Sequence, residues 1–304
     1  MINTKKSRKQ LEKENNGLKI VTFVLIIIFL TFNCQEKTND ADTINRSIAL
    51  EGQPNFRDIG AYETGSGEHI KTDILYRSGT LSRLTDSDVE KLKSLNIKTV
   101  VNFLTEEERN KNGEDILPEG VKSIYLPISG QNNEAVAILK ARENGDFSDV
   151  PSDFNFKIHG ILVEDAKAEY AELFHILADK ESYKIVFHCS HGIHRTGTAA
   201  SIILSILGVP WEKVREDYLL SNEYRKEEIE KRIAALTSLA RENPDISDQE
   251  KNLENIEAFY VLKGEYVDGT KTTIENNYES FEHYLQDIGV QEMEIEKIKD
   301  ILIE

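Results

Sequence analysis

Cysteine, positive charge and long apolar runs are all scarce in this chain of 304 residues, and each shortage excludes a class of protein. The two cysteines, Cys34 and Cys189, are too few for a disulfide framework. Lys and Arg number 37 against 54 Asp and Glu, a net charge of −17, so the surface repels nucleic acid. The longest apolar run, residues 20–32, is short for a bilayer-spanning helix, which needs about 20 residues. The hydrophobic fraction of 39% still allows one sizeable core.

The N-terminus has the features of a targeting segment. Six Lys or Arg precede the apolar run, which predicts a secretory signal over residues 1–33. Cys34 follows at once and resembles the lipidated cysteine of a bacterial lipoprotein, although Thr31 and Asn33 stand where Leu and a small residue are usual. The polar residues 34–48 then form a tether. Lipoprotein, uncleaved membrane anchor and plain secretion remain three interpretations, and all three place the rest of the chain outside the cytoplasm.

The most informative stretch is residues 188–197, His-Cys-Ser-His-Gly-Ile-His-Arg-Thr-Gly. A short apolar strand precedes it and an apolar helix follows it, ending at Gly208. A tight loop between a strand and a helix N-terminus directs backbone N–H groups at one point and suits an oxyanion. Arg195 adds a two-pronged donor for phosphate, and the same positive field would lower the pKa of Cys189. The pattern therefore predicts a cysteine nucleophile beneath a bound phosphoryl group.

Two other interpretations of this stretch exist. A lone cysteine among apolar residues is usually a small buried hydrophobe. His188, Cys189, His191 and His194 could also be seen as metal ligands. A loop around an anion splays its side chains outward, however, and no second Cys or His cluster completes a ligand set, so we expect no metal and no cofactor. We expect His188 to hold the loop by hydrogen bonds, and His191 and His194 to line its mouth.

The Cys-x5-Arg-Thr pattern resembles the signature of the protein-tyrosine-phosphatase superfamily. Within it, four stretches are similar to a bacterial and fungal tyrosine-phosphatase family: residues 55–58 (Asn-Phe-Arg-Asp), 75–79 (Leu-Tyr-Arg-Ser-Gly), 217–225 and 278–285. The resemblance implies an α/β fold with a central sheet of four or five strands flanked by helices, a helical C-terminal extension, and a catalytic domain over residues 49–304. It also implies phosphomonoester hydrolysis with Cys189, Arg195 and Thr196 as catalytic residues, and residues 190–195 (Ser190, His191, Gly192, Ile193, His194, Arg195) as the phosphate-binding loop.

This sequence departs from the family in two places. The strand that usually ends Asp-Leu-Arg ends here as Asn102-Phe103-Leu104, so a carboxylate and a guanidinium are missing. The loop has Ile193-His194 where many relatives have Lys-Asp, which weakens any inference of a preference for inositol phospholipids. The strand before Pro127 also lacks a following Asp. Asp58 and Glu106 are therefore kept as candidates for the general acid, the group that would protonate the leaving oxygen.

Helical patterns are predicted over residues 164–181, 226–242, 249–262, 270–287 and 291–303. The charged insert 225–262 comes soon after the loop and could cover the pocket. The interpretation of the whole is a protein-tyrosine or dual-specificity phosphatase acting on a phosphorylated protein, a peptide or a small phosphomonoester. It would contact a membrane only through its N-terminus. Phosphoinositide or inositol-phosphate hydrolysis, and a catalytically idle phosphate-binding protein, remain the alternatives.

Overall fold

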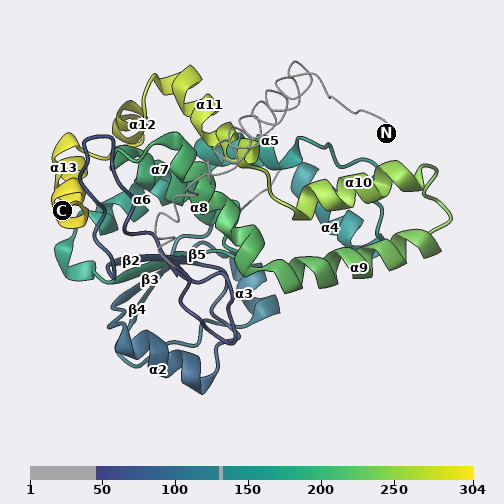
Figure 1. Cartoon of the computed structure of the whole chain (residues 1–304), viewed down its shortest axis with the longest axis horizontal. Coiled ribbons are helices and arrows are strands. Elements are labelled where there is room, and N and C mark those ends of the chain that lie inside the picture. Colours follow the sequence, from purple (N-terminus) through teal and green to yellow (C-terminus); the bar gives the residue numbers. More distant parts are fainter. Residues whose placement is uncertain (1–45, 130–132) are drawn as a thin grey trace, which may run out of the picture. The chain divides into compact units, whose positions relative to one another are not determined.

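Figure 1 shows a computed structural model of the chain, which describes residues 46–129 and 133–304. The predicted signal segment 1–33, the lipidation candidate Cys34 and most of the tether lie outside these residues and stay predictions. Residues 46–304 form one compact unit. Within the part of the chain described, no helix is both long enough and apolar enough to cross a membrane.

A five-stranded sheet lies at the centre, in the order β1-β2-β5-β3-β4. Strand β1 runs antiparallel to β2, and the other neighbours are parallel. This confirms the predicted mixed α/β fold. Since β5 is the middle strand, the loop that follows it leaves the sheet between the ends of β2 and β3. The strands are β1 (Arg57–Asp58), β2 (Leu75–Ser78), β3 (Thr99–Asn102), β4 (Lys122–Tyr125) and β5 (Ile185–His188).

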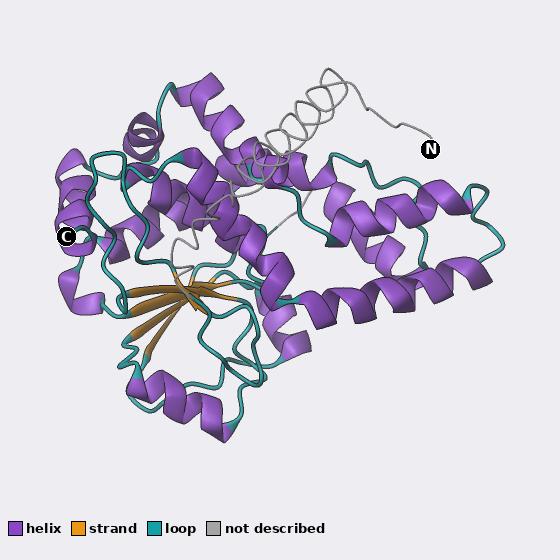
Figure 2. Cartoon of the chain, in the orientation of Figure 1, coloured by secondary structure: helices purple, strands orange, loops and turns teal. Residues whose placement is uncertain are grey.

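The two faces of the sheet bury separate cores because successive side chains of a strand point to opposite sides. Ile185 and Phe187 of β5 join the larger core, whereas Val186 between them joins the core under α2. All four residues of β5 are buried, as expected for a central parallel strand covered on both faces. Figures 1 and 2 show α2 on one side of the sheet and most other helices on the opposite side.

Helices make up most of the remaining chain. Thr85 begins α2 with a reciprocal capping box to Asp88, and Asn96, with φ of 56°, follows its end. The helices are α2 (Asp86–Ser94), α3 (Glu106–Asn112), α4 (Asn133–Asn144), α5 (Phe154–Asp165), α6 (Lys167–Leu177), α7 (Arg195–Ile206), α8 (Trp211–Tyr224), α9 (Lys226–Glu242), α10 (Gln249–Tyr260), α11 (Asp268–Tyr278), α12 (Phe281–Asp287) and α13 (Glu292–Leu302), with short 3-10 turns at Lys180–Ser182 and Gly264–Tyr266.

Two predicted helices are each broken in the structure. The predicted helix 164–181 is the end of α5 followed by α6, with fully buried Ala166 between them. The predicted helix 270–287 is α11 and α12, because Glu279 adopts a φ of 69° and Ser280 caps α12 through its side chain. Apolar periodicity continues through both breaks, so it could not reveal them.

The predicted insert 225–262 forms the antiparallel pair α9 and α10, which extends beside the sheet domain (Figure 1). It has its own apolar cluster with residues of α4 and α5, including Phe147, Phe154, Leu236 and Phe259. Phe259 and Phe154 also lie against the ring of His194, at centroid distances of 6.5 Å each. The insert therefore borders the predicted phosphate-binding loop.

Candidate active site

The predicted phosphate-binding loop leaves the carboxyl end of β5 and ends where α7 begins at Arg195. Residues Thr196 to Leu204 of α7 are all buried, so packing fixes the direction of this helix. Its N-terminus, with free N–H groups and the positive end of the helix dipole, lies at the loop. The strand, loop and helix therefore have the arrangement predicted for an anion cup.

Cys189 lies at the start of this loop and is only 4% exposed. Burial raises the pKa of its thiol, but the charge of Arg195 and hydrogen bonds from Thr196 and the backbone N–H of Gly192 outweigh burial, so the pKa is lowered overall. Among the residues that the structure describes, the buried Thr196 hydroxyl has no hydrogen-bond partner other than this sulfur. These surroundings favour a thiolate.

Arg195 is held by Glu108 of α3 in a two-pronged ion pair. Nη1 donates to Oε2 and Nη2 to Oε1, each at 2.6 Å. Nη1 also donates to the carbonyls of Phe103 and Ile128, and Ser190 Oγ donates to Glu108 Oε1 at 2.9 Å. Burial raises the pKa of Glu108, but the opposing effect of Arg195 is larger and lowers this pKa overall, to about 2. The carboxylate is therefore charged. The plane of the guanidinium is thereby fixed beside the loop.

A second carboxylate, Asp115, lies behind Cys189. His188 connects the two: its Nε2 is 3.0 Å from Asp115 Oδ2, and its Nδ1 is 3.3 Å from the carbonyl oxygen of Cys189. Asn102 donates to the same Asp115 oxygen at 2.7 Å. Burial raises the pKa of Asp115, but His188 and Asn102 lower it overall. His188 thus makes the loop-holding hydrogen bonds that the sequence predicts, with a carboxylate supplied from outside the strand that lacks one.

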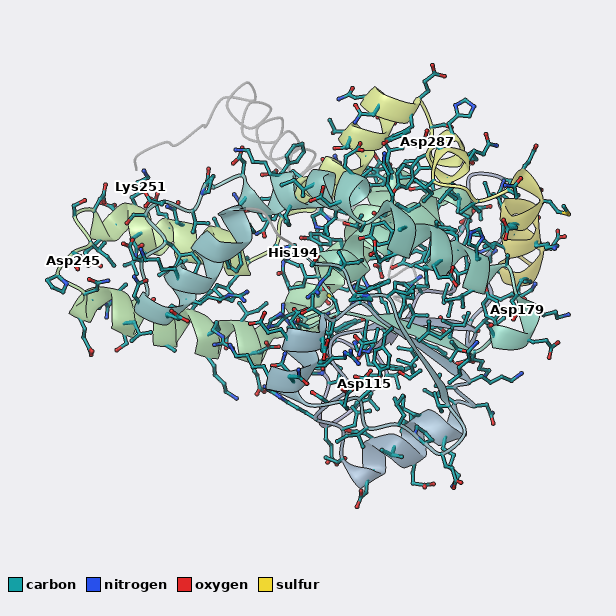
Figure 3. The ribbon with its side chains drawn as sticks, turned by 180° about the vertical axis from the view of Figure 1, so that it is seen from behind. Asp115, Asp179, His194, Asp245, Lys251 and Asp287 are labelled. Atoms are coloured by element: carbon teal, nitrogen blue, oxygen red, sulfur yellow. The ribbon has the colours of Figure 1, made fainter. Side chains whose placement is uncertain are left out.

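His194 and His191 border the cup from the side of the insert. Figure 3 labels His194 where α4, α9 and α10 meet the rest of the molecule. Its Nε2 lies 2.8 Å from Asn155 Oδ1, and burial together with Arg142 and Arg195 lowers its pKa to about 3. His191 lies 3.8 Å from Glu228 of α9, and burial with nearby arginines holds its pKa well below the usual value. Both rings are therefore neutral near pH 7.

The structure does not bring the two candidate general acids to this loop. Both oxygens of Asp58 accept backbone N–H groups, from Gly60 at 2.7 Å and Asp73 at 2.6 Å. Asp73 precedes β2, which runs parallel to β5. The Asp58 carboxylate therefore lies at the amino-terminal ends of these strands, and the loop lies at their carboxyl ends. Glu106 is exposed on α3, roughly 200° around the helix from Glu108.

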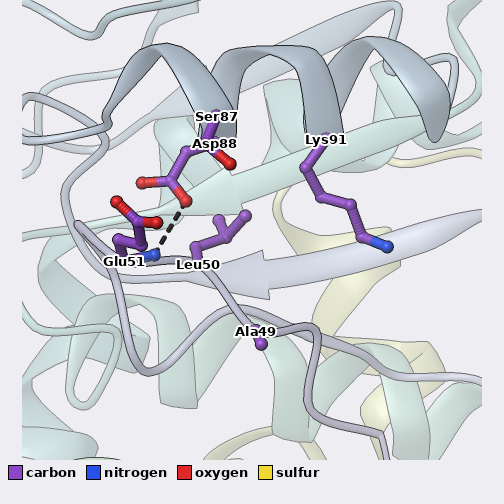
Figure 4. A pocket seen from close by; sticks show the side chains of 6 residues that line it. All are labelled: Ala49, Leu50, Glu51, Ser87, Asp88 and Lys91. Atoms are coloured by element: carbon purple, nitrogen blue, oxygen red, sulfur yellow. Dashed lines mark hydrogen bonds between the residues drawn. The ribbon is translucent and has the colours of Figure 1, made fainter.

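Among residues 46–129 and 133–304, no three His, Cys, Asp or Glu side chains gather as metal ligands. A surface hollow between residues 49–51 and α2 lies under the other face of the sheet (Figure 4). Two carboxylates line it, Glu51 and Asp88, and Asp88 accepts the backbone N–H groups of Glu51 at 2.7 Å and Gly52 at 2.8 Å. Asp88 therefore joins the N-terminal segment to α2.

Sequence analysis missed Glu108 and Asp115 as part of the site. Glu108 carries one usable signal: Thr105 followed three residues later by Glu is a capping box, which the structure contains. That signal predicts the start of α3 but not the contact with Arg195, 87 residues away. Asp115 has no local signal, since its partners come from β3 and β5.

The chain was compared with known proteins. Residues 48–304 match the tyrosine phosphatase family. A tyrosine-protein phosphatase of Nostoc commune is 25% identical over 240 residues, which cover 76% of this chain and 74% of that protein. The triple specificity protein phosphatase PtpB of Mycobacterium tuberculosis is 23% identical over 281 residues, 84% of this chain and 98% of that protein.

A search of solved structures found the core catalytic domain of a PP-IP phosphatase of S. cerevisiae in complex with citrate. It has a TM-score of 0.31 and 14% identity, and the match covers 76% of this chain and 95% of that one. The match to the family spans nearly all of the residues that the structure describes and includes the whole loop from Cys189 to Arg195. The chain belongs to the tyrosine phosphatase family and is a phosphatase of the cysteine-dependent type.

Proposed function

We propose that Cys189 is the nucleophile and that the reaction passes through a phosphocysteine. The thiolate attacks phosphorus, the sulfur–phosphorus bond forms, and the bond from phosphorus to the leaving oxygen breaks. Water then attacks phosphorus, inorganic phosphate leaves and the thiolate is restored. The observation that carries this proposal is the position of Cys189 at the start of a loop that ends at Arg195 on the N-terminus of α7, where Arg195 and donors of the loop lower the pKa of this buried thiol.

Arg195 and Thr196 have separate roles in this proposal. Glu108 takes one hydrogen of each terminal nitrogen of Arg195, and the second hydrogen of Nη2 points to Ser190 Oγ at 3.2 Å. We assign Nε, together with this Nη2 hydrogen once it turns from Ser190, to the equatorial phosphate oxygens. The loop N–H groups bind the same oxygens. The Thr196 hydroxyl would donate to the sulfur as the phosphoryl group departs, stabilising the returning thiolate. Gly192 permits close approach of the backbone, with φ of 71°.

The substrate we propose is a phosphotyrosine-containing protein or peptide. Neither Asp58 nor Glu106 is placed to protonate a leaving oxygen, and His194 with a pKa of about 3 is no acid at neutral pH. Without a proton donor, the reaction loses the factor of about 10²–10⁴ that a general acid typically contributes. A phenolic oxygen tolerates this loss better than an alkyl oxygen, because it leaves more easily as an anion. Aryl phosphates are therefore favoured over phosphoserine, phosphothreonine and inositol phosphates.

The test compares release of phosphate from a phosphotyrosine peptide, a phosphoserine peptide and an inositol polyphosphate. We expect the aryl ester to have the largest kcat/KM, and vanadate to inhibit its turnover. A larger kcat/KM for the inositol polyphosphate would reverse the proposed substrate class. No release from any of the three would favour the phosphate-binding protein without activity.

We also propose that the N-terminal segment exports the protein and that Cys34 carries a lipid, which would hold the phosphatase at the outer side of a membrane. The basic flank, the short apolar run and the cysteine directly after it support this proposal. Metabolic labelling with a radioactive fatty acid should label the wild type and not Cys34→Ser. Label retained by Cys34→Ser would contradict lipidation at this residue.

A further inference from the structure

Two buried arginines share one buried carboxylate directly behind the phosphate-binding loop. Arg57 is 0% exposed, and Arg77 and Asp217 are 1% exposed. Arg57 Nε donates to Asp217 Oδ1 at 3.1 Å, and Arg77 Nη1 donates to Oδ2. Burial raises the pKa of Asp217, but the two arginines lower it to about 2, so all three groups are charged. Burying three charged groups is costly in free energy. This cost suggests that the three groups have a function besides packing.

Hydrogen bonds connect both arginines to carbonyl groups of the loop, directly for Arg77 and through Asn55 for Arg57. Arg77 Nη2 donates to the carbonyl oxygen of Gly192 at 2.7 Å. Arg57 Nη1 donates to Asn55 Oδ1 at 2.6 Å, and Asn55 Nδ2 in turn donates to the carbonyl oxygen of His191 at 2.8 Å. These residues come from three of the stretches that carry the family resemblance and that the proposed reaction leaves unused. We call Asn55, Arg57, Arg77 and Asp217 the Asp217 clamp.

The geometry of the peptide unit carries the effect of the clamp to the nucleophile. In a planar trans peptide the carbonyl and the N–H point in opposite directions. When Asn55 holds the carbonyl of His191, the N–H of Gly192 must point to the opposite side of the peptide, and this N–H is one of the groups that lower the pKa of Cys189. When Arg77 holds the carbonyl of Gly192, the N–H of Ile193 is turned in the same way.

The clamp can approach the loop this closely only because position 192 is glycine. A Cβ there would lie 2.5 Å from the carbonyl oxygen of Ser78 and 2.9 Å from Asn55 Nδ2. The φ of 71° is also one that other residues rarely adopt. A loop that only connected β5 to α7 would need neither this close contact nor this backbone conformation.

We propose that the Asp217 clamp is a set of positioning residues that orients the N–H groups of Gly192 and Ile193 toward the sulfur and the phosphate. None of its side chains needs to touch substrate. The proposal rests on the proposed function, because it assigns the clamp a role in lowering the pKa of the same nucleophile. It makes α8, which carries Asp217, part of the machinery of the site.

The test measures the pKa of the Cys189 thiol in Asn55→Ala. Iodoacetamide reacts with thiolate, so the rate of alkylation of the Cys189 peptide, followed by mass spectrometry against pH, gives the pKa without requiring turnover. Asn55→Ala leaves the Gly192 peptide free to rotate, and we expect the pKa to rise by about one unit, a tenfold smaller thiolate fraction below the pKa. The matched control is Asn222→Ala, whose side chain bonds to both backbone groups of Leu262 instead of the loop.

An unchanged pKa in Asn55→Ala, or an equal rise in Asn222→Ala, overturns the proposal. If Asn55→Ala fails to fold, Arg77→Lys decides, because it keeps the buried charge but cannot hold both Asp217 and the Gly192 carbonyl. In Arg77→Lys we expect inorganic phosphate to inhibit about tenfold more weakly, and wild-type inhibition would count against the clamp. If the wild type releases no phosphate from an aryl ester, the proposed function fails, while the alkylation experiment still decides the role of the clamp.

Discussion

Glu108 and Arg195 face each other through two parallel hydrogen bonds of 2.6 Å, although they belong to different helices and lie 87 residues apart. The pair joins α3 to the first residue of α7. Because both oxygens of the carboxylate and both terminal nitrogens of the guanidinium take part, the guanidinium cannot rotate in its plane. The position of the Arg195 guanidinium is thus set by a residue outside the loop.

Glu108→Gln should loosen Arg195 and weaken phosphate binding. An amide can accept through one oxygen only, so the two-pronged pair becomes a single neutral contact. We expect KM for an aryl phosphate to rise about tenfold to a hundredfold, from the loss of roughly 1.5–3 kcal/mol of charge-assisted bonding. Glu107→Gln, an exposed neighbour on the same helix, is the matched control. Equal kinetic constants in the two variants would show that Glu108 does not position Arg195.

The same pair predicts how stability depends on pH. The pKa of Glu108 is lowered in the folded state from 4.5 to about 2. Its contribution is therefore present above about pH 4.5 and is lost as pH falls toward 2. Urea unfolding should show wild type more stable than Glu108→Gln at pH 7, with a difference that shrinks at pH 3. A difference that grows on acidification would contradict the ion pair.

Thr196→Val should slow the second step of the reaction more than the first. The variant keeps the shape of the side chain but removes the hydroxyl that would donate to the departing sulfur. Pre-steady-state measurement with an aryl phosphate should then show a burst of phenol followed by turnover about tenfold slower than in the wild type. Thr196→Ser, which keeps a hydroxyl, should restore most of the rate. Wild-type turnover by Thr196→Val would remove the hydroxyl from the mechanism.

Asp115→Asn tests the buried network behind Cys189. Asp115 Oδ2 accepts from both Asn102 and His188, and Oδ1 accepts the backbone N–H of Leu81 at 3.3 Å. An amide has only one oxygen, so its NH2 group would face at least one of these donors. We expect a loss of about 3 kcal/mol in the free energy of unfolding at pH 7, as for one partner removed from a buried pair. Since the pKa of Asp115 is lowered, the loss should diminish below about pH 4. Asp245→Asn, an exposed surface change, serves as the control.

The pH dependence of kcat/KM should report Cys189 and not His194. The pKa of Cys189 is lowered, so kcat/KM should rise with pH to a plateau with a midpoint below the ordinary thiol value of about 8.5. His194, with a pKa of about 3, is already neutral throughout pH 5–8. His194→Gln should therefore keep the shape of the profile. An inflection near pH 6.5 that disappears in His194→Gln would show that this ring titrates.

The sequence predicts those parts of the fold and site whose causes are local. The strand before Cys189 and the helix after it depend on neighbouring residues, so their apolar patterns identify them. The breaks at Ala166 and Glu279 do not interrupt the apolar pattern, so periodicity does not reveal them; the second also depends on the left-handed φ of Glu279 and the Ser280 cap.

The partners of the loop are hidden for the same reason. Asn102 stands where the family resemblance implies a carboxylate, and its side chain donates to Asp115 in the segment after α3. Glu108 lies two residues from the candidate Glu106, and only the orientation of α3 decides which of them faces Arg195. Residue types at such positions are visible in the sequence, whereas their meeting point depends on the tertiary fold.

The central claim is that the phosphoryl group is carried by the sulfur of Cys189. Rapid acid quench during turnover of an aryl phosphate, followed by mass spectrometry of the Cys189 peptide, tests it most directly. We predict a peptide heavier by one phosphoryl group in the wild type, more of it in Thr196→Val, and none in Cys189→Ser. Turnover by the wild type with no phosphorylated Cys189 peptide, or near-normal turnover by Cys189→Ser, would contradict the account.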